Sequence, residues 1–200
     1  MLTVRRTHER GHSSPGWLER YHTFSFGIYH DPDHMGFSNL RVINDDTVAP
    51  GRGFATHGHA DMEIISHVLE GVLAHKDSMG NGSVTRPGDG QRMSAGTGVT
   101  NSEYNHSADE PVHFLQIWLL PNRTGVVPGY GQRSFHLEDR REKLVLPVCP
   151  DGRDGSIAAH EDALLYGKLL ESGQLLSHLL PHGRRVYAHA ANSKANVNGD

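Results

Sequence analysis

Two short strings in this sequence place metal-binding side chains two residues apart. The first is His57-Gly58-His59 and the second is Asn101-Ser102-Glu103. Along a β-strand, residues two apart point to the same face and lie about 6.5 to 7 Å from each other, so each pair can turn both side chains toward one ion. If the two strands are neighbours, the two pairs together predict a metal pocket.

The donor types narrow the chemistry of that pocket. Neutral imidazole and carboxylate suit zinc, iron, nickel, copper or manganese, and two histidines with one carboxylate resemble the facial arrangement of non-haem iron sites. The residues alone leave the metal open. In a chain with 16 histidines, a single His-x-His string is a weak signal, and most histidines must have packed or solvated roles. The carboxylate of Glu103 strengthens the signal, because its spacing allows it to join the same ion.

Strands are needed to position these pairs, and the rest of the sequence supplies them. Turn residues at 49–53 precede the segment 54–59, and turn residues at 95–98 precede 99–104. Short apolar runs punctuated by Gly and Pro recur at 40–43, 54–59, 63–69, 72–77, 83–86, 91–95, 99–105 and 112–120. This hairpin rhythm is typical of sandwiches and barrels and predicts an all-β protein of the jelly-roll type.

The pattern divides the chain into three parts. Residues 1–121 hold the predicted strands and the candidate metal site, and residues 122–150, rich in Gly, Pro and charge, read as a connector. In residues 151–200 strands are expected again, at 157–160, 165–170, 175–180 and 186–190. This second β unit has no His-x-His string. It stops at 198–200 within what reads as a further hairpin, so we expect it to be incomplete.

Composition excludes several classes of protein. The net charge of −4 and the pI of about 6.4 give no cationic surface of the kind that binds DNA or RNA. A single cysteine, Cys149, rules out an internal disulfide and indicates a reducing compartment. No apolar run approaches the roughly 20 residues of a membrane span. We therefore expect a cytoplasmic protein that contacts neither membrane nor nucleic acid.

The stretch from Gly51 to Trp118 resembles the cupin metal motifs of pirin-like proteins. The matching strings are Gly51-x5-His57-x-His59-x3-Glu63, Val68-Leu69-Glu70-Gly71, His75-x-Asp77-Ser78, Met93-Ser94-Ala95-Gly96-Thr97-Gly98 and Ser102-Glu103. Near the C-terminus, Leu179-Leu180-Pro181-x-Gly183 with Tyr187 and His189 is similar to the second unit of the same family. The resemblance implies a bicupin, two β-barrel units in one chain, with metal in the N-terminal unit only.

The resemblance also implies a ligand set. Pirin-like proteins bind one divalent metal, commonly iron, through two histidines on the first strand and a histidine plus a glutamate on the second. By position, the ligands here are His57, His59 and Glu103, with Asn101 where the family has histidine. An amide oxygen is a poorer donor to these metals than imidazole. We therefore expect iron(II) first, with zinc, nickel, copper or manganese as alternatives, and binding that is weakened or lost.

Three functions follow as hypotheses. Some pirin-like proteins cleave the flavonol quercetin with dioxygen, so the first hypothesis is a quercetin-type 2,3-dioxygenase. Glu103 would then be a structural ligand or the general base that takes the proton of the substrate hydroxyl. The second hypothesis is a non-enzymatic metal-binding regulator that acts through a protein partner. The third is a metal-free, degenerate cupin in which Asn101 marks the lost site.

Other residues near the motifs carry further expectations. Glu63 falls where other cupins keep a metal carboxylate, and it shares the parity of His57 and His59 if one strand runs straight through. His67 and His106 are further candidates to compensate for Asn101, although a packed, hydrogen-bonded role suits His67 better. The residues expected to line the pocket are Phe54, Tyr104, Gln116 and Trp118.

Overall fold

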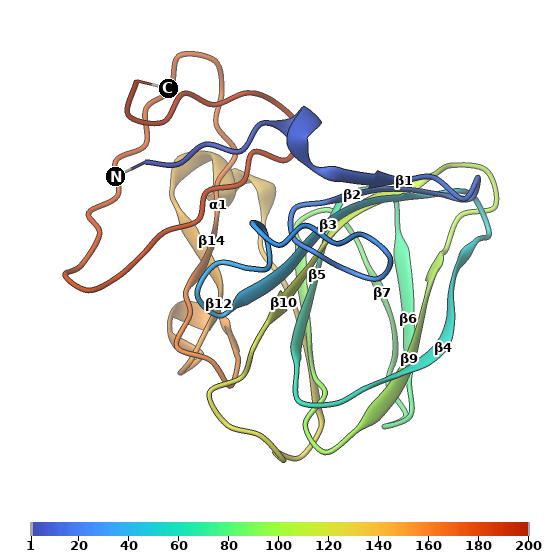
Figure 1. Cartoon of the computed structure of the whole chain (residues 1–200). Helices are drawn as coiled ribbons and strands as arrows, with labels where there is room; N and C mark the ends of the chain where they lie inside the picture. The colour runs from blue at the N-terminus through green and yellow to red at the C-terminus, as the bar shows by residue number, and fades with distance from the viewer. Residues whose placement is uncertain (1, 200) are drawn as a thin grey trace.

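The computed structural model describes residues 2–199, and two antiparallel β-sheets packed face to face form most of it (Figure 1). The larger sheet has, in spatial order, β1 (Gly11–Ser13), β2 (Leu18–His22), β3 (Leu40–Val48), β10 (Val112–Leu119), β5 (Glu63–Glu70), β8 (Asp89–Ser94) and β11 (Gly129–Ser134). The smaller sheet has β4 (Gly53–His59), β9 (Val99–Asn105), β6 (Leu73–Asp77) and β7 (Gly82–Thr85). This two-sheet arrangement confirms the predicted all-β cupin fold.

All eight strands predicted between residues 40 and 120 are present. Strand β10 illustrates why the sequence pattern predicted them. Phe114 on one face of β10 packs with Leu73 and Val68 inside the sandwich. Ile117 on the other face packs with residues of the second unit, among them Val148. Because both faces of β10 are covered, its sequence is an almost continuous apolar run.

The second unit is a small sheet that lies against the outer face of the larger one. Its strands are β12 (Val145–Cys149), β13 (Ile157–Ala158) and β14 (Leu165–Gly167), with β12 in the centre. The strands expected at 175–180 and 186–190 are absent, since residues 168–199 contain no helix or strand. Leu175 and Leu179 are more than nine-tenths exposed, so their apolar side chains have no sheet face to pack against.

The segment expected to be a connector contains regular structure. Within 122–150 lie β11, the helix α1 (Leu137–Glu142) and β12. Strand β11 pairs with β8 and extends the larger sheet. Its glycines, Gly129 and Gly131, gave the sequence a loop-like composition, because glycine is depleted in strands and frequent in turns. The short strands β1 and β2 were also not predicted.

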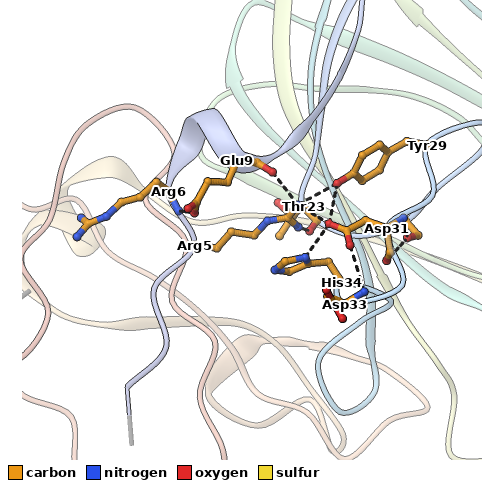
Figure 2. Close-up of polar contacts among 9 residues, drawn as sticks. Arg5, Arg6, Glu9, Thr23, Tyr29, Asp31, Asp33 and His34 are labelled. Carbon is orange, nitrogen blue, oxygen red and sulfur yellow. Dashed lines mark hydrogen bonds and ion pairs between the residues drawn. The ribbon is translucent and has the colours of Figure 1, made fainter.

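The N-terminal residues fasten a long loop, 23–39, that joins β2 to β3. Figure 2 shows Arg5 reaching the Thr23 carbonyl, the Tyr29 hydroxyl and the Asp31 carboxylate from a single guanidinium group. His34 binds the same carboxylate through Nδ1 at 2.7 Å. These contacts give the loop a fixed shape before the chain enters β3. Two short 3-10 helices, η1 (Thr7–Glu9) and η2 (Arg153–Gly155), complete the elements, and no helix in the described chain is long and apolar enough to cross a membrane.

Candidate metal centre

Strands β4 and β9 bring the two predicted ligand pairs side by side. In their antiparallel ladder His57 lies opposite Asn101, and Phe54 lies opposite Glu103. Three residue steps on β4 therefore match two on β9, which is a β-bulge between Phe54 and His57. Because the extra residue changes the alternation, both Phe54 and His57 can face the same side as Asn101 and Glu103.

The two histidines of β4 lie close together at one end of the strand. The ring centroids of His57 and His59 are 4.7 Å apart, and the His59 ring meets the Trp118 ring edge to face at 5.1 Å. His57 Nδ1 lies 2.8 Å from the carbonyl oxygen of Ala55. A carbonyl oxygen only accepts, so Nδ1 carries the proton and Nε2 keeps its lone pair free for a metal.

The electrostatic surroundings keep His59 neutral. Burial lowers the pKa of His59 to about 4, and neighbouring His57 lowers it further, whereas the nearby side chain of Asn101 acts in the opposite direction. A neutral imidazole is the form that coordinates metals. Near neutral pH His59 is therefore ready to act as a donor.

Asn101 is buried beside these rings, and its amide oxygen has no partner. The residue is 2% exposed, and Oδ1 makes no hydrogen bond to any described residue. An unpaired buried acceptor is costly unless a donor or a cation satisfies it. Two imidazoles and an unpaired amide oxygen fit a divalent transition metal, although as a weaker donor set than one with a third histidine.

Glu103 lies on the same inner face but is held by other side chains. Its Oε1 accepts a hydrogen bond from Ser66 Oγ at 2.9 Å, and its Oε2 accepts one from Gln116 Nε2 at 2.8 Å. Within residues 2–199, no three His, Cys, Asp or Glu side chains are close enough together to form a metal cluster. Glu103 therefore neighbours the two histidines and Asn101 but does not form a compact ligand cluster with them.

A cleft of about 470 Å³ opens over the two histidines. It is lined by His57 and His59 together with Trp17, Arg20, Phe26, Gly53, Phe54, Ala55, Gln116 and Trp118. The expected lining residues Phe54, Gln116 and Trp118 are thus confirmed. Tyr104 instead lines a smaller pocket of about 290 Å³ that shares Trp17 and Gly53 with the cleft.

The three residues proposed to compensate for Asn101 are Glu63, His67 and His106. All three lie away from the two histidines of β4. Asp61 has a φ of 47°, so the chain turns between β4 and β5 and no single strand runs from His57 to Glu63. Glu63 accepts a hydrogen bond from Ser94 at 2.8 Å, on the face of β5 opposite to that of Ser66. His67 shares that outer face and contacts Arg140 at 3.2 Å, and the side chain of His106 is exposed.

The cleft residues missed from the sequence include three large side chains contributed by the β2 region. Trp17 and Arg20 lie just before and within β2, and Phe26 lies in the loop that follows. The alternation of Leu18, a buried residue, with polar neighbours was the available signal for β2. No sequence signal indicated Phe26, because its position depends on the loop fastened by Arg5 and Asp31.

Two facing antiparallel sheets with a His-x-His strand beside an Asn-x-Glu strand define a cupin with a candidate metal site. The chain belongs to the pirin family. The family model described as Pirin matches residues 3–119, and the one described as Quercetinase C-terminal cupin domain matches residues 146–200.

Relatives and solved structures agree with this assignment. The Escherichia coli K12 protein named quercetin 2,3-dioxygenase is 46% identical over 199 residues, which cover 100% of this chain and 85% of that protein. The crystal structure of YhhW from Escherichia coli superposes with a TM-score of 0.78 at 51% identity, covering 81% of this chain and 68% of that one. A structure of the same bacterial pirin in complex with nickel(II) gives a TM-score of 0.77 at 51% identity, covering 81% and 69%.

Proposed function

We propose that this chain binds one divalent transition metal through His57, His59, Asn101 and Glu103, and that it is a quercetin-type flavonol 2,3-dioxygenase. The observation that carries the proposal is the convergence of two imidazoles and an unpaired amide oxygen beneath an aromatic cleft. Iron(II) is the first metal to test. Nickel is the second, since a related pirin has been solved with nickel(II).

The cleft suits a planar aromatic substrate. Trp17, Phe26, Phe54 and Trp118 supply ring faces and edges around it, and Trp17 meets Phe54 edge to face at 5.3 Å. Aromatic pairs prefer offset-stacked or edge-to-face arrangements, which such a lining can offer to a flavonol.

The metal, when bound, would supply Lewis acidity toward the oxygens of the substrate. Within the protein, His57 is oriented by the carbonyl of Ala55, and His59 by its edge-to-face contact with Trp118. Glu103 would either stay a ligand of that metal or leave it to act as the general base that takes the proton of the substrate hydroxyl. Gln116 lines the cleft and donates to Glu103 Oε2, so it connects the base to the space where the hydroxyl would lie.

The substrate, the location and the partner remain parts of this proposal. A flavonol-like small molecule is supported by the names of the relatives and by the aromatic cleft. A reducing, cytoplasmic location is supported by the single buried cysteine, Cys149. A protein partner, which the regulator hypothesis requires, stays a prediction.

The direct test is the loss of quercetin in air, measured with metal-reconstituted protein. We expect turnover by the unchanged chain and a loss of at least about a hundredfold in His57→Ala, because that variant lacks one imidazole donor. The matched control is His106→Ala, which removes an exposed histidine outside the cleft. Equal quercetin loss with the unchanged chain and His57→Ala would contradict the proposal.

A further inference from the structure

Arg20 places a positive charge in the wall of the aromatic cleft. Its guanidinium lies 5.0 Å from the ring centre of Phe54 and 5.4 Å from that of Phe26. Arginine stacks on aromatic faces through its planar, weakly hydrated cation. The side chain is 11% exposed, so the charge is largely withdrawn from bulk water while it still borders the cleft.

Asp46 on β3 holds this guanidinium from behind. Arg20 Nε lies 2.6 Å from Asp46 Oδ1, and Nη2 lies 2.5 Å from Oδ2, which makes a bidentate pair. The two residues are opposite each other in the β2–β3 ladder, and Asp46 is fully buried. Burial raises the pKa of Asp46 to about 6, against the opposing effect of Arg20, so above this pH the carboxylate is ionised and the pair is intact.

The bidentate pair leaves part of the guanidinium unused. Arginine has five N–H donors, and the Nη1 group of Arg20 makes no hydrogen bond to any residue in 2–199. Phe26, one of the two rings beside it, lies in the loop 23–39 between β2 and β3. Arg5 and Asp31 fasten this loop (Figure 2). The free donors are therefore held in a rigid position next to a space shaped for aromatic rings.

We propose that Arg20 is a specificity-determining residue of the cleft, and that its free guanidinium donors bind an ionised oxygen carried by a planar aromatic ligand. The inference rests on the proposed function in one respect, that the cleft is the substrate site. It adds that anionic aromatic ligands are preferred over neutral ones of the same shape. Charge-assisted hydrogen bonds of this kind are about twice as strong as neutral ones.

The two tryptophans of the chain give a reporter that needs no turnover. The sequence contains two tryptophans, Trp17 and Trp118, and both line the cleft. Ligand binding can thus be followed by quenching of tryptophan fluorescence in the full chain, with a chelator present and again after metal loading. The probes are 2-naphthoate and 2-naphthamide, which share one ring system but differ in charge.

We expect 2-naphthoate to bind the unchanged chain at least about tenfold more tightly than 2-naphthamide at pH 7.5, the size of one charge-assisted hydrogen bond. The double variant Arg20→Gln/Asp46→Asn should lose this preference and keep its affinity for 2-naphthamide. The double change avoids an unpaired buried carboxylate, which would threaten folding. Arg20→Lys keeps the charge without the planar fork and should give an intermediate preference.

The control Arg86→Gln removes an exposed positive charge in the turn between β7 and β8 and should leave the preference unchanged. The inference is overturned if the double variant still prefers 2-naphthoate, or if neither probe quenches the unchanged chain. Quercetin turnover is read separately. If quercetin is turned over but the ligand preference does not depend on Arg20, the inference fails and the proposed function stands. If the preference depends on Arg20 but quercetin is not turned over, the inference stands and the dioxygenase proposal fails.

Discussion

Ser66 Oγ on β5 lies 2.9 Å from Glu103 Oε1 on β9, so this hydrogen bond joins the two sheets at the candidate metal centre. Both residues are buried, and the bond crosses from the larger sheet to the smaller one. The orientation of the carboxylate is thus set by the packing of the sandwich as well as by its own strand.

Ser66→Ala should therefore affect both stability and metal binding. Loss of the hydroxyl leaves one buried carboxylate oxygen unpaired, at a cost of about 1 to 3 kcal/mol in the free energy of unfolding. Metal affinity should fall about tenfold, because Glu103 loses a group that orients it. Urea denaturation and metal titration measure the two effects.

Ser94→Ala provides a matched control. Ser94 donates to Glu63 at 2.8 Å, which is the same hydroxyl-to-carboxylate bond on the outer face of the larger sheet. It should lower stability by a similar amount and leave metal affinity unchanged. Equal metal affinities of Ser66→Ala and the unchanged chain would show that Glu103 does not depend on this bond.

Asn101→His should strengthen metal binding. The position is buried beside His59 and opposite His57, and imidazole is a better donor than an amide to iron, nickel or copper. We expect a gain of about tenfold or more in the association constant, measured by competition with a chromophoric chelator. Thr100→His adds an imidazole to the exposed face of the same strand and should give no gain. No gain in Asn101→His would argue that the pocket has lost more than one ligand.

The close approach of β4 to β9 requires glycine at position 53. A Cβ there would lie 2.2 Å from the carbonyl oxygen of Glu103 and 2.5 Å from Cα of Tyr104. Gly53→Ala should push the two strands apart and lower the free energy of unfolding by more than about 2 kcal/mol, with weaker metal binding. Gly58→Ala, on the same strand, has its nearest contact at 4.0 Å and should be tolerated. Equal urea midpoints for the two variants would contradict this account of the ladder.

His67 should make the fold sensitive to mild acid. Burial, followed by the charge of Arg140, lowers the pKa of His67 from 6.5 to about 4. Between these values the unfolded chain binds a proton that the folded chain does not, so stability is complete above pH 6.5 and is lost as the pH falls toward 4. At pH 5 the loss from this group is about 2 kcal/mol.

His67→Gln tests this sign and size. The variant should lose less stability between pH 7.5 and pH 5 than the unchanged chain does, as measured by urea denaturation at each pH. His106→Gln replaces an exposed histidine and should keep the original profile. If His67→Gln loses more stability between pH 7.5 and pH 5 than the unchanged chain does, the predicted effect of His67 has the wrong sign.

Much of the sandwich could be predicted, because its strands alternate or are buried on both faces. The strands from β3 to β10 carried apolar patterns bounded by turns, and the inner face of β9 could be read from Asn101 and Glu103. Strand β11 could not be read, since Gly129 and Gly131 carry no side chain to show a buried face.

The candidate site was only partly visible in the sequence for a related reason. The spacing of His57 and His59 follows from strand geometry, which is local. The bulge that turns Phe54 toward the cleft and the hydrogen bonds that hold Glu103 depend on partners far along the chain, such as Ser66 and Gln116. Arg20 was missed because its role arises only when β2 pairs with β3 and brings it onto Asp46.

The metal content of the purified chain tests the central claim most directly. Untagged protein, prepared without chelator and then reconstituted with iron(II), would be measured by plasma mass spectrometry beside His57→Ala and His106→Ala. The account predicts about one metal ion per chain in the unchanged protein and in His106→Ala, and a near-complete loss in His57→Ala. A content far below one that is the same in all three proteins would contradict it and would show that Asn101 has ended the metal site.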